Sequence, residues 1–242
     1  MIDVQKITKN YGAVEAVKEV SFSAADGRIT ALLGPNGAGK STSLRILSTV
    51  ARPDSGNAWV AGVDVVYDPM TVRQRIGVLP HNSGLYSRLT GIENIRYYGR
   101  LQGIETQQLE VRIALLVEQL AMGEFCSRRT AGFSQGQQIK IALARALIHD
   151  PQHIILDEPT NGLDVMATRA LREIVLNLRS QGKCILFSSH IMQEVDALCD
   201  HVIVISSGLV RFDGSISDFR ALAGTASLED AFVQIAGLGE TP

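Results

Sequence analysis

The stretch Gly34-Pro-Asn-Gly-Ala-Gly-Lys40-Ser41 decides the fold of this chain. It matches the pattern GxxxxGK[ST], follows an apolar run at Ile29–Leu33 and precedes helix-forming residues at 44–47. A strand, a glycine-rich loop and a helix in this order form a phosphate site. The glycines let backbone N–H groups converge on phosphate oxygens, and the helix N-terminus adds partial positive charge. The pattern predicts that Lys40 reaches the β- and γ-phosphates of a nucleotide and that the Ser41 hydroxyl ligates Mg²⁺.

The whole loop is expected to contact the nucleotide. The residues predicted to do so are Gly34, Pro35, Asn36, Gly37, Ala38, Gly39, Lys40, Ser41 and Thr42. A glycine-rich turn without a ligand is the simpler alternative, and the flanking strand and helix argue against it.

Two adjacent carboxylates complete the predicted site. The apolar segment 153–156 reads as a strand and ends at Asp157 and Glu158. Asp157 can hold Mg²⁺ through its water shell. Glu158 points differently because strand side chains alternate, and it could polarise an attacking water as a general base. The alternative is a solvated acidic strand end, which the phosphate loop disfavours.

The order of apolar runs predicts an α/β fold with a P-loop NTPase core. Buried-type strands alternate with helical patterns, which indicates a mostly parallel sheet covered on both faces. Shorter strands near the N-terminus predict an antiparallel β edge on this core; they are expected at Ile2–Ile7, Ser21–Ala24 and Asn57–Val60.

The middle of the chain predicts an inserted helical subdomain. Residues 90–149 show helical periodicity with almost no strand signal, and Thr90 and Glu93 have capping-box spacing. Ser227 and Asp230 repeat that spacing before a short apolar helix. We expect one domain over 1–242; its parts are an α/β core at 1–89 and 150–214, the helical subdomain at 90–149, and a short helical tail at 215–242.

Composition excludes several classes of protein. Of 242 residues, 45% are hydrophobic and 20% are charged, which argues against intrinsic disorder. No run approaches ~18 apolar residues, so a membrane span is not expected. The net charge is −2 with dispersed basic residues, which argues against a nucleic-acid partner. With no secretory h-region at the start and three cysteines without a CxxC pair, the chain is expected to be cytoplasmic.

The segment Phe133–Gln137, followed by a helical run and then Ile154–Asp164, resembles the signature, Walker B and D-loop of ABC ATPases in their family order. The resemblance covers nearly the whole chain. It is strongest to the nucleotide-binding subunits of exporter-type ABC transporters, a group with sodium-extrusion and drug-efflux pumps. Gly84–Thr90 has the style of that group.

The resemblance implies roles for further residues. Tyr11 falls where the family stacks an aromatic ring on adenine, although alone it would be an ordinary strand-end aromatic. His190 matches the histidine that contacts the γ-phosphate, although alone it would be a histidine at a helix start. Asp164 matches the D-loop aspartate and could also cap the next helix.

The signature segment raises a problem of distance. Ser134 could simply cap the helix that follows, yet a helix N-terminus with Gly136 is also an anion site. A helix over 135–149 would be ~22 Å long at ~1.5 Å per residue, so Ser134 is expected to lie well away from the strand end at 157. The resemblance implies that a second copy of the chain resolves this. Each ATP would lie between one copy's phosphate loop and the other's Ser134, Gly136 and Gln137.

Two positions depart from the family pattern. His81 stands where a glutamine usually senses Mg²⁺ and the attacking water, and a histidine can still donate or accept a hydrogen bond there. Gln135 replaces the first glycine of the usual signature, which changes the flexibility of the loop. Neither change removes Lys40, Asp157 or His190.

The resemblance therefore implies an ATPase that uses ATP and Mg²⁺ and drives a separate transmembrane permease subunit, in the direction of export, from the cytoplasmic face of the membrane. Docking is expected around Leu85, Tyr86 and Leu89, although these residues could equally be local packing. The rival prediction is a soluble ABC-type ATPase acting on nucleic acid or protein assemblies. Such proteins usually carry two cassettes or a coiled coil, which this chain lacks. The transported substrate cannot be predicted from these motifs.

Overall fold

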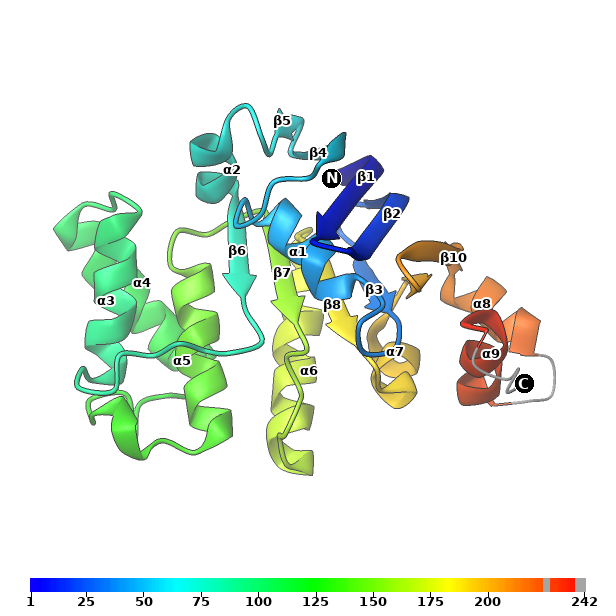
Figure 1. Cartoon of the computed structure of the whole chain (residues 1–242). Helices are drawn as coiled ribbons and strands as arrows, with labels where there is room; N and C mark the ends of the chain where they lie inside the picture. The colour runs from blue at the N-terminus through cyan, green and yellow to red at the C-terminus, as the bar shows by residue number, and fades with distance from the viewer. Residues whose placement is uncertain (224–226, 238–242) are drawn as a thin grey trace.

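The computed structural model describes residues 1–223 and 227–237. Two sheets and the helices around them make up the described part (Figure 1). The predicted α/β class with a mostly parallel sheet is confirmed. Positions 224–226 and 238–242 of the predicted tail lie outside the described residues.

The larger sheet has six strands in the order β10-β9-β3-β8-β7-β6. All neighbouring pairs are parallel except β10 with β9. The strands are β3 (Ile29–Leu33), β6 (Ile76–Leu79), β7 (His153–Asp157), β8 (Cys184–Ser189), β9 (His201–Ser206) and β10 (Leu209–Ser215). Leu33 pairs with Ser189 and Asp157 pairs with Ser188, so the carboxyl ends of β3, β7 and β8 meet at one edge.

The antiparallel strands form a second sheet rather than an edge of the first. Its order is β2-β1-β4-β5, and the strands are β1 (Ile2–Tyr11), β2 (Val14–Ala24), β4 (Ser55–Val60) and β5 (Val63–Asp64). β1 and β2 are longer than predicted because they continue into a tight hairpin at Gly12, whose φ is 60°. Helix α1 (Lys40–Leu47) packs between the two sheets, and its apolar side chains share one core with strands of both.

Alternate residues of the central strands enter different cores, as expected for a sheet covered on both faces. On β8, Ile185 and Phe187 join the core that contains the larger helices. Cys184 and Leu186 join the core beneath the antiparallel sheet. The continuous apolar runs of the sequence therefore reflect burial on both sides.

Helices fill the segment between β6 and β7, as the periodicity predicts. They are α3 (Gly91–Leu101), α4 (Thr106–Gln119), the 3-10 turn η1 (Thr130–Gly132) and α5 (Gln135–Leu147), and they stand together at one side of the large sheet (Figure 1). The Thr90–Glu93 capping box is formed at the start of α3. The division of the chain into core, helical subdomain and tail stays a prediction.

The remaining helices cover the sheet or follow it. They are α2 (Pro69–Arg75), α6 (Val165–Ser180), α7 (Met192–Leu198), α8 (Ile216–Ala223) and α9 (Leu228–Ile235). The predicted capping box of Ser227 and Asp230 begins α9. Among the described helices, none has the length and apolar character needed to cross a bilayer.

Candidate functional site: a phosphate loop and two carboxylates

The loop between β3 and α1 can take its shape only with glycine at certain positions. At Gly39 φ is 110°, and an added Cβ would lie 2.5 Å from the Ala16 carbonyl oxygen. A Cβ on Gly34 would lie 2.2 Å from the carbonyl oxygen of Ile205. The glycines thus permit both the left-handed backbone and the close approach of neighbouring strands.

This loop borders a cavity of about 650 Å³, a size that suits a nucleotide. Residues of the loop, of β2 and of three other segments line it: Val14, Ala16, Pro35, Asn36, Gly37, Ala38, Gly39, Lys40, Ser41, Thr42, His81, Glu158, Asn161 and His190. The cavity therefore brings together most of the predicted nucleotide-binding residues. Gly34 is not among the lining residues, and its carbonyl oxygen accepts a hydrogen bond from the Lys40 ammonium.

Lys40 is the buried cation of the site. It is 5% exposed, and its Nζ donates to the carbonyl oxygens of Gly34 at 2.6 Å and Pro35 at 3.3 Å. Its Nζ also lies 3.7 Å from Glu158 Oε1. A positive charge fixed in this way is well placed for phosphate oxygens that enter the cavity.

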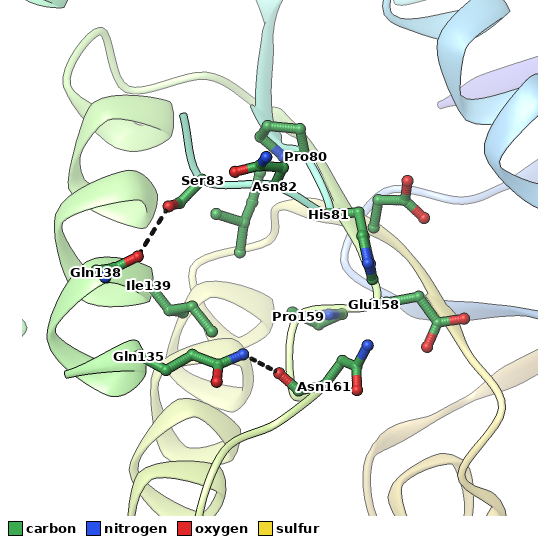
Figure 2. A pocket seen from close by; sticks show the side chains of 12 residues that line it. Pro80, His81, Asn82, Ser83, Gln135, Gln138, Ile139, Glu158, Pro159 and Asn161 are labelled. Carbon is green, nitrogen blue, oxygen red and sulfur yellow. Dashed lines mark hydrogen bonds between the residues drawn. The ribbon is translucent and has the colours of Figure 1, made fainter. Parts of the chain in front are cut away.

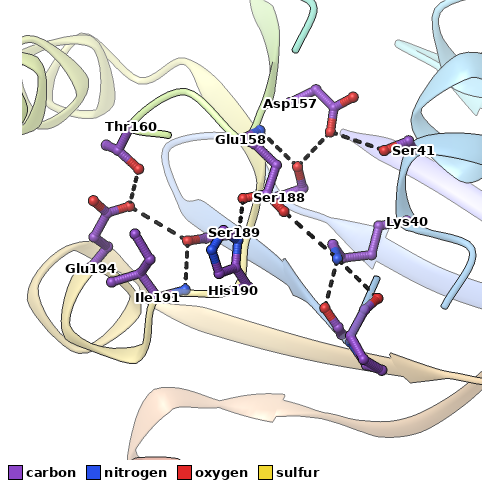
Figure 3. A network of polar contacts seen from close by, with 12 residues as sticks. Lys40, Ser41, Asp157, Glu158, Thr160, Ser188, Ser189, His190, Ile191 and Glu194 are labelled. Atoms are coloured by element: carbon purple, nitrogen blue, oxygen red, sulfur yellow. Dashed lines mark hydrogen bonds and ion pairs between the residues drawn. The ribbon is translucent and has the colours of Figure 1, made fainter. Parts of the chain in front are cut away.

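Asp157 and Ser41 present oxygen atoms to a common point. Asp157 Oδ1 accepts hydrogen bonds from Ser188 Oγ at 2.7 Å and from Ser41 Oγ at 3.3 Å (Figure 3). A carboxylate and a hydroxyl beside a phosphate site are the hard oxygen ligands that Mg²⁺ prefers. The residues present therefore fit the ion that the phosphate loop implies.

Glu158 contacts both Lys40 and His190. Its Oε2 lies 2.7 Å from His190 Nδ1, and its backbone N–H donates to Ser188 Oγ at 2.9 Å. Its φ of 51° is a left-handed conformation that is uncommon outside glycine. The Glu158 side chain is only 12% exposed, whereas that of His190 is 49% exposed. A carboxylate held between a cation and an imidazole can accept a proton from water.

The signature segment begins α5 as predicted. Ser134 and Gln137 form a reciprocal capping box, in which the Ser134 Oγ accepts from Gln137 N–H and the Gln137 side chain accepts from Ser134 N–H. Ser134 is exposed and Gln137 is half-buried. Among the described residues, the lining of the nucleotide-sized cavity does not include Ser134, Gly136 or Gln137.

The separation of Ser134 from the strand end at 157 stays a prediction, while the next residue, Gln135, contacts the turn that follows this strand. Gln135 Nε2 donates to the Asn161 carbonyl oxygen at 2.6 Å, and Gln135 lines a second cavity of about 350 Å³ together with Asp157 and Glu158 (Figure 2). The start of α5 therefore contacts the turn that follows β7.

Three other predicted residues differ in how they relate to the cavity. His81 lines both cavities. Asp164 caps α6, since its Oδ1 accepts from the Ala167 N–H at 2.8 Å. Tyr11 is 46% exposed, and the centroid of its ring lies 5.8 Å from Lys9 Nζ. In the same hairpin, Val14 and Ala16 line the nucleotide-sized cavity.

Sequence reasoning missed two groups of site residues. Ser188 joins Asp157 to the Glu158 backbone, and Thr160, Ser189 and Glu194 form a neighbouring network. The signal that could have found them was the pair of serines at the carboxyl end of an apolar strand, since ligand sites of parallel sheets gather at that edge.

Comparisons with known proteins agree with this geometry. The family described as "ABC transporter" matches residues 17–161. The ABC transporter ATP-binding protein NatA of Bacillus subtilis is 47% identical over 204 residues, which are 84% of this chain and 83% of NatA. The doxorubicin resistance ATP-binding protein DrrA of Mycobacterium tuberculosis is 36% identical over 228 residues, or 93% of this chain and 69% of DrrA.

Solved structures give the same result. "Structure of ATP binding subunit of ABC transporter" superposes with a TM-score of 0.88 at 30% identity, covering 97% of this chain and 99% of that one. "Dimeric Structure of MJ0796, a Bacterial ABC Transporter Cassette" has a TM-score of 0.81 at 26% identity, covering 89% of this chain and 99% of that one. With the loop, the paired carboxylates and the signature helix in place, the chain belongs to the ABC transporter family as one of its ATP-binding subunits, an ATPase.

Proposed function

We propose that this chain hydrolyses Mg-ATP to drive export through a separate membrane subunit. The observation that carries the proposal is the contact of Glu158 with both Lys40 and His190 at the wall of the nucleotide-sized cavity. The three groups supply a cation for phosphate, a base for water and a further contact for the terminal phosphate.

The roles follow from the chemistry of each group. Residues 34–42 bind the phosphates with their backbone N–H groups, and Lys40 neutralises the β- and γ-phosphates. Ser41 and Asp157 would hold Mg²⁺, which would supply positive charge beside the phosphates. Glu158 takes a proton from the attacking water, and His190 contacts the γ-phosphate. Tyr11 at the hairpin end stacks on adenine, and His81 takes the place of the glutamine near the metal.

Two copies of the chain close around two nucleotides in this proposal. Ser134, Gly136 and Gln137 lie outside the nucleotide-sized cavity of their own chain, while a capped helix start remains able to bind an anion. They would therefore bind the ATP held by the other copy, with Asp164 near the contact. The dimeric structure of the similar cassette MJ0796 supports the pairing of two copies.

The membrane partner and the direction of transport are inferred from relatives. The name of DrrA includes resistance to doxorubicin, and another relative at 40% identity is a Nod factor export ATP-binding protein of Rhizobium meliloti. We place the docking surface at Leu85, Tyr86 and Leu89, on the cytoplasmic face of the membrane. Tyr86 is 47% exposed and packs edge-on against Tyr97, whereas Leu85 is half-buried against the core.

Co-purification from membranes tests this function. The tagged chain, expressed in its source cells and extracted in detergent, is expected to retain a multi-span membrane protein in stoichiometric amount. Tyr86→Glu should release that protein, because a charge would enter an apolar contact. Tyr67→Glu is the matched control, since Tyr67 is 86% exposed and lies before α2, away from the proposed surface. A soluble complex without a membrane protein would contradict the proposal.

A further inference from the structure

A buried carboxylate lies beside the proposed catalytic pair and has no part in the chemistry described so far. Glu194 is in α7, four residues after His190, and is 2% exposed. Its Oε2 accepts a hydrogen bond from Thr160 Oγ1 at 2.5 Å and lies 3.5 Å from Ser189 Oγ (Figure 3).

These contacts join two separate segments of the site. Thr160 belongs to the turn that begins at Glu158 and continues to Asp164. Ser189 precedes His190 and accepts from the Ile191 N–H at 3.0 Å, which shapes the turn that carries the histidine. One carboxylate therefore links the segment that presents the base to the segment that presents the imidazole.

Packing alone does not account for a carboxylate here. Burial raises the pKa of Glu194, and the Glu158 carboxyl group of the adjoining turn also raises it. The hydrogen bonds from Thr160 and Ser189 and the Arg172 guanidinium of α6 oppose this rise. Burying a charge without full compensation costs stability, and an apolar side chain would fill the same space without that cost.

We infer that Glu194 is a positioning residue, which sets the placement of Glu158 relative to His190 by holding Thr160 and Ser189 together. The inference rests on the proposed roles of Glu158 and His190. The 158–164 turn also carries Asp164, which is expected to lie near the second copy. If the second copy displaced this turn, the Glu194–Thr160 contact would pass the displacement to His190.

Steady-state kinetics of the full chain with Mg-ATP test this. Glu194→Ala should lower kcat roughly 10- to 100-fold, the effect of a small misplacement of reacting groups, and leave KM within about twofold. Glu194→Gln should recover most of kcat, since its amide oxygen can accept from Thr160. Thr160→Val should lower kcat as Glu194→Ala does, and the double variant should be no worse than either alone.

Controls separate this inference from folding and from the proposed function. Gln193→Ala changes an exposed neighbour on the same helix and should leave kcat unchanged. Wild-type kcat in Glu194→Ala, or equal loss in the alanine and glutamine variants, would overturn the positioning role. Full turnover in Glu158→Gln would instead overturn the proposed function itself, whatever Glu194 does.

Discussion

The residue that bears most of the proposed chemistry is held in an uncommon conformation. Glu158 has a φ of 51°, which costs of order 1–3 kcal/mol outside glycine. Its backbone N–H donates to Ser188, and its side chain contacts Lys40 and His190. Glu158→Gln keeps the size of the side chain but cannot take a proton at neutral pH. We expect it to lose about 10²- to 10⁴-fold in ATP hydrolysis while ATP still binds. Phosphate release and equilibrium dialysis with ATP measure the two effects, and hydrolysis at the wild-type rate would refute the assignment of the base.

Lys40 is predicted to act in binding as well as in turnover. Lys40→Ala removes a buried cation that lies among loop carbonyls, so the affinity for ATP should fall by at least about tenfold, as expected for loss of a charged hydrogen bond. Titration with a fluorescent ATP analogue measures this. Lys140→Ala, a half-buried lysine of α5 outside the nucleotide-sized cavity, serves as the control. Equal affinity in the two variants would remove Lys40 from the phosphate site.

At the scale of elements, helices α3 and α5 both begin with a capping box but differ in their proposed function. Ser134 caps α5 and Thr90 caps α3, each in a reciprocal capping box. Ser134→Ala and Thr90→Ala should each destabilise the protein by about 1 kcal/mol, because a helix N–H loses its partner. Only Ser134→Ala is expected to lower ATPase activity as well. Thermal unfolding and phosphate release distinguish these effects, and matching activity in the two variants would leave α5 with a structural cap alone.

The contact between α7 and the 158–164 turn predicts a dependence of stability on pH. Since the folded-state pKa of Glu194 is raised, the folded protein binds this proton more readily than the unfolded chain. The free-energy cost of burying the charged Glu194 carboxylate is absent below the unfolded-state pKa of about 4.3. It destabilises the folded protein as the pH rises through the folded-state pKa. Glu194→Gln should therefore raise Tm relative to wild type at pH 8 and have less effect at pH 4.5. A Tm difference that does not change with pH would contradict the raised pKa.

At the scale of the whole molecule, the two proposed phosphate-binding helix starts face different partners. α1 begins at the chain's own cavity, whereas the start of α5 contacts Asn161 and is not part of that cavity. If a second copy completes the site, Glu158→Gln should form a dimer with Mg-ATP and remain a monomer with ADP, because ATP would join the two surfaces without being consumed. Light scattering after size exclusion measures the mass. A monomer under both conditions would contradict the composite site.

Some features of this protein were determined by the sequence alone. The glycine loop, the paired carboxylates, the capping boxes at Thr90 and Ser227 and the N-cap at Ser134 were all predicted correctly as local structure. Each depends on residues within a few positions of one another, so a local sequence pattern is enough to predict it. The alternation of apolar runs and helices likewise indicated a sheet buried on both faces.

Only the tertiary structure decided which distant groups meet. The Ser188–Asp157 contact spans 31 residues and the Thr160–Glu194 contact spans 34, and each arises because strand order and register bring two chain segments to one edge. The antiparallel strands formed a separate sheet, and Gln135 at the start of α5 bonded to Asn161, 26 residues later in the chain. Sequence periods report which face a residue shares with its near neighbours, whereas pairing between segments is set by the packing of the entire core.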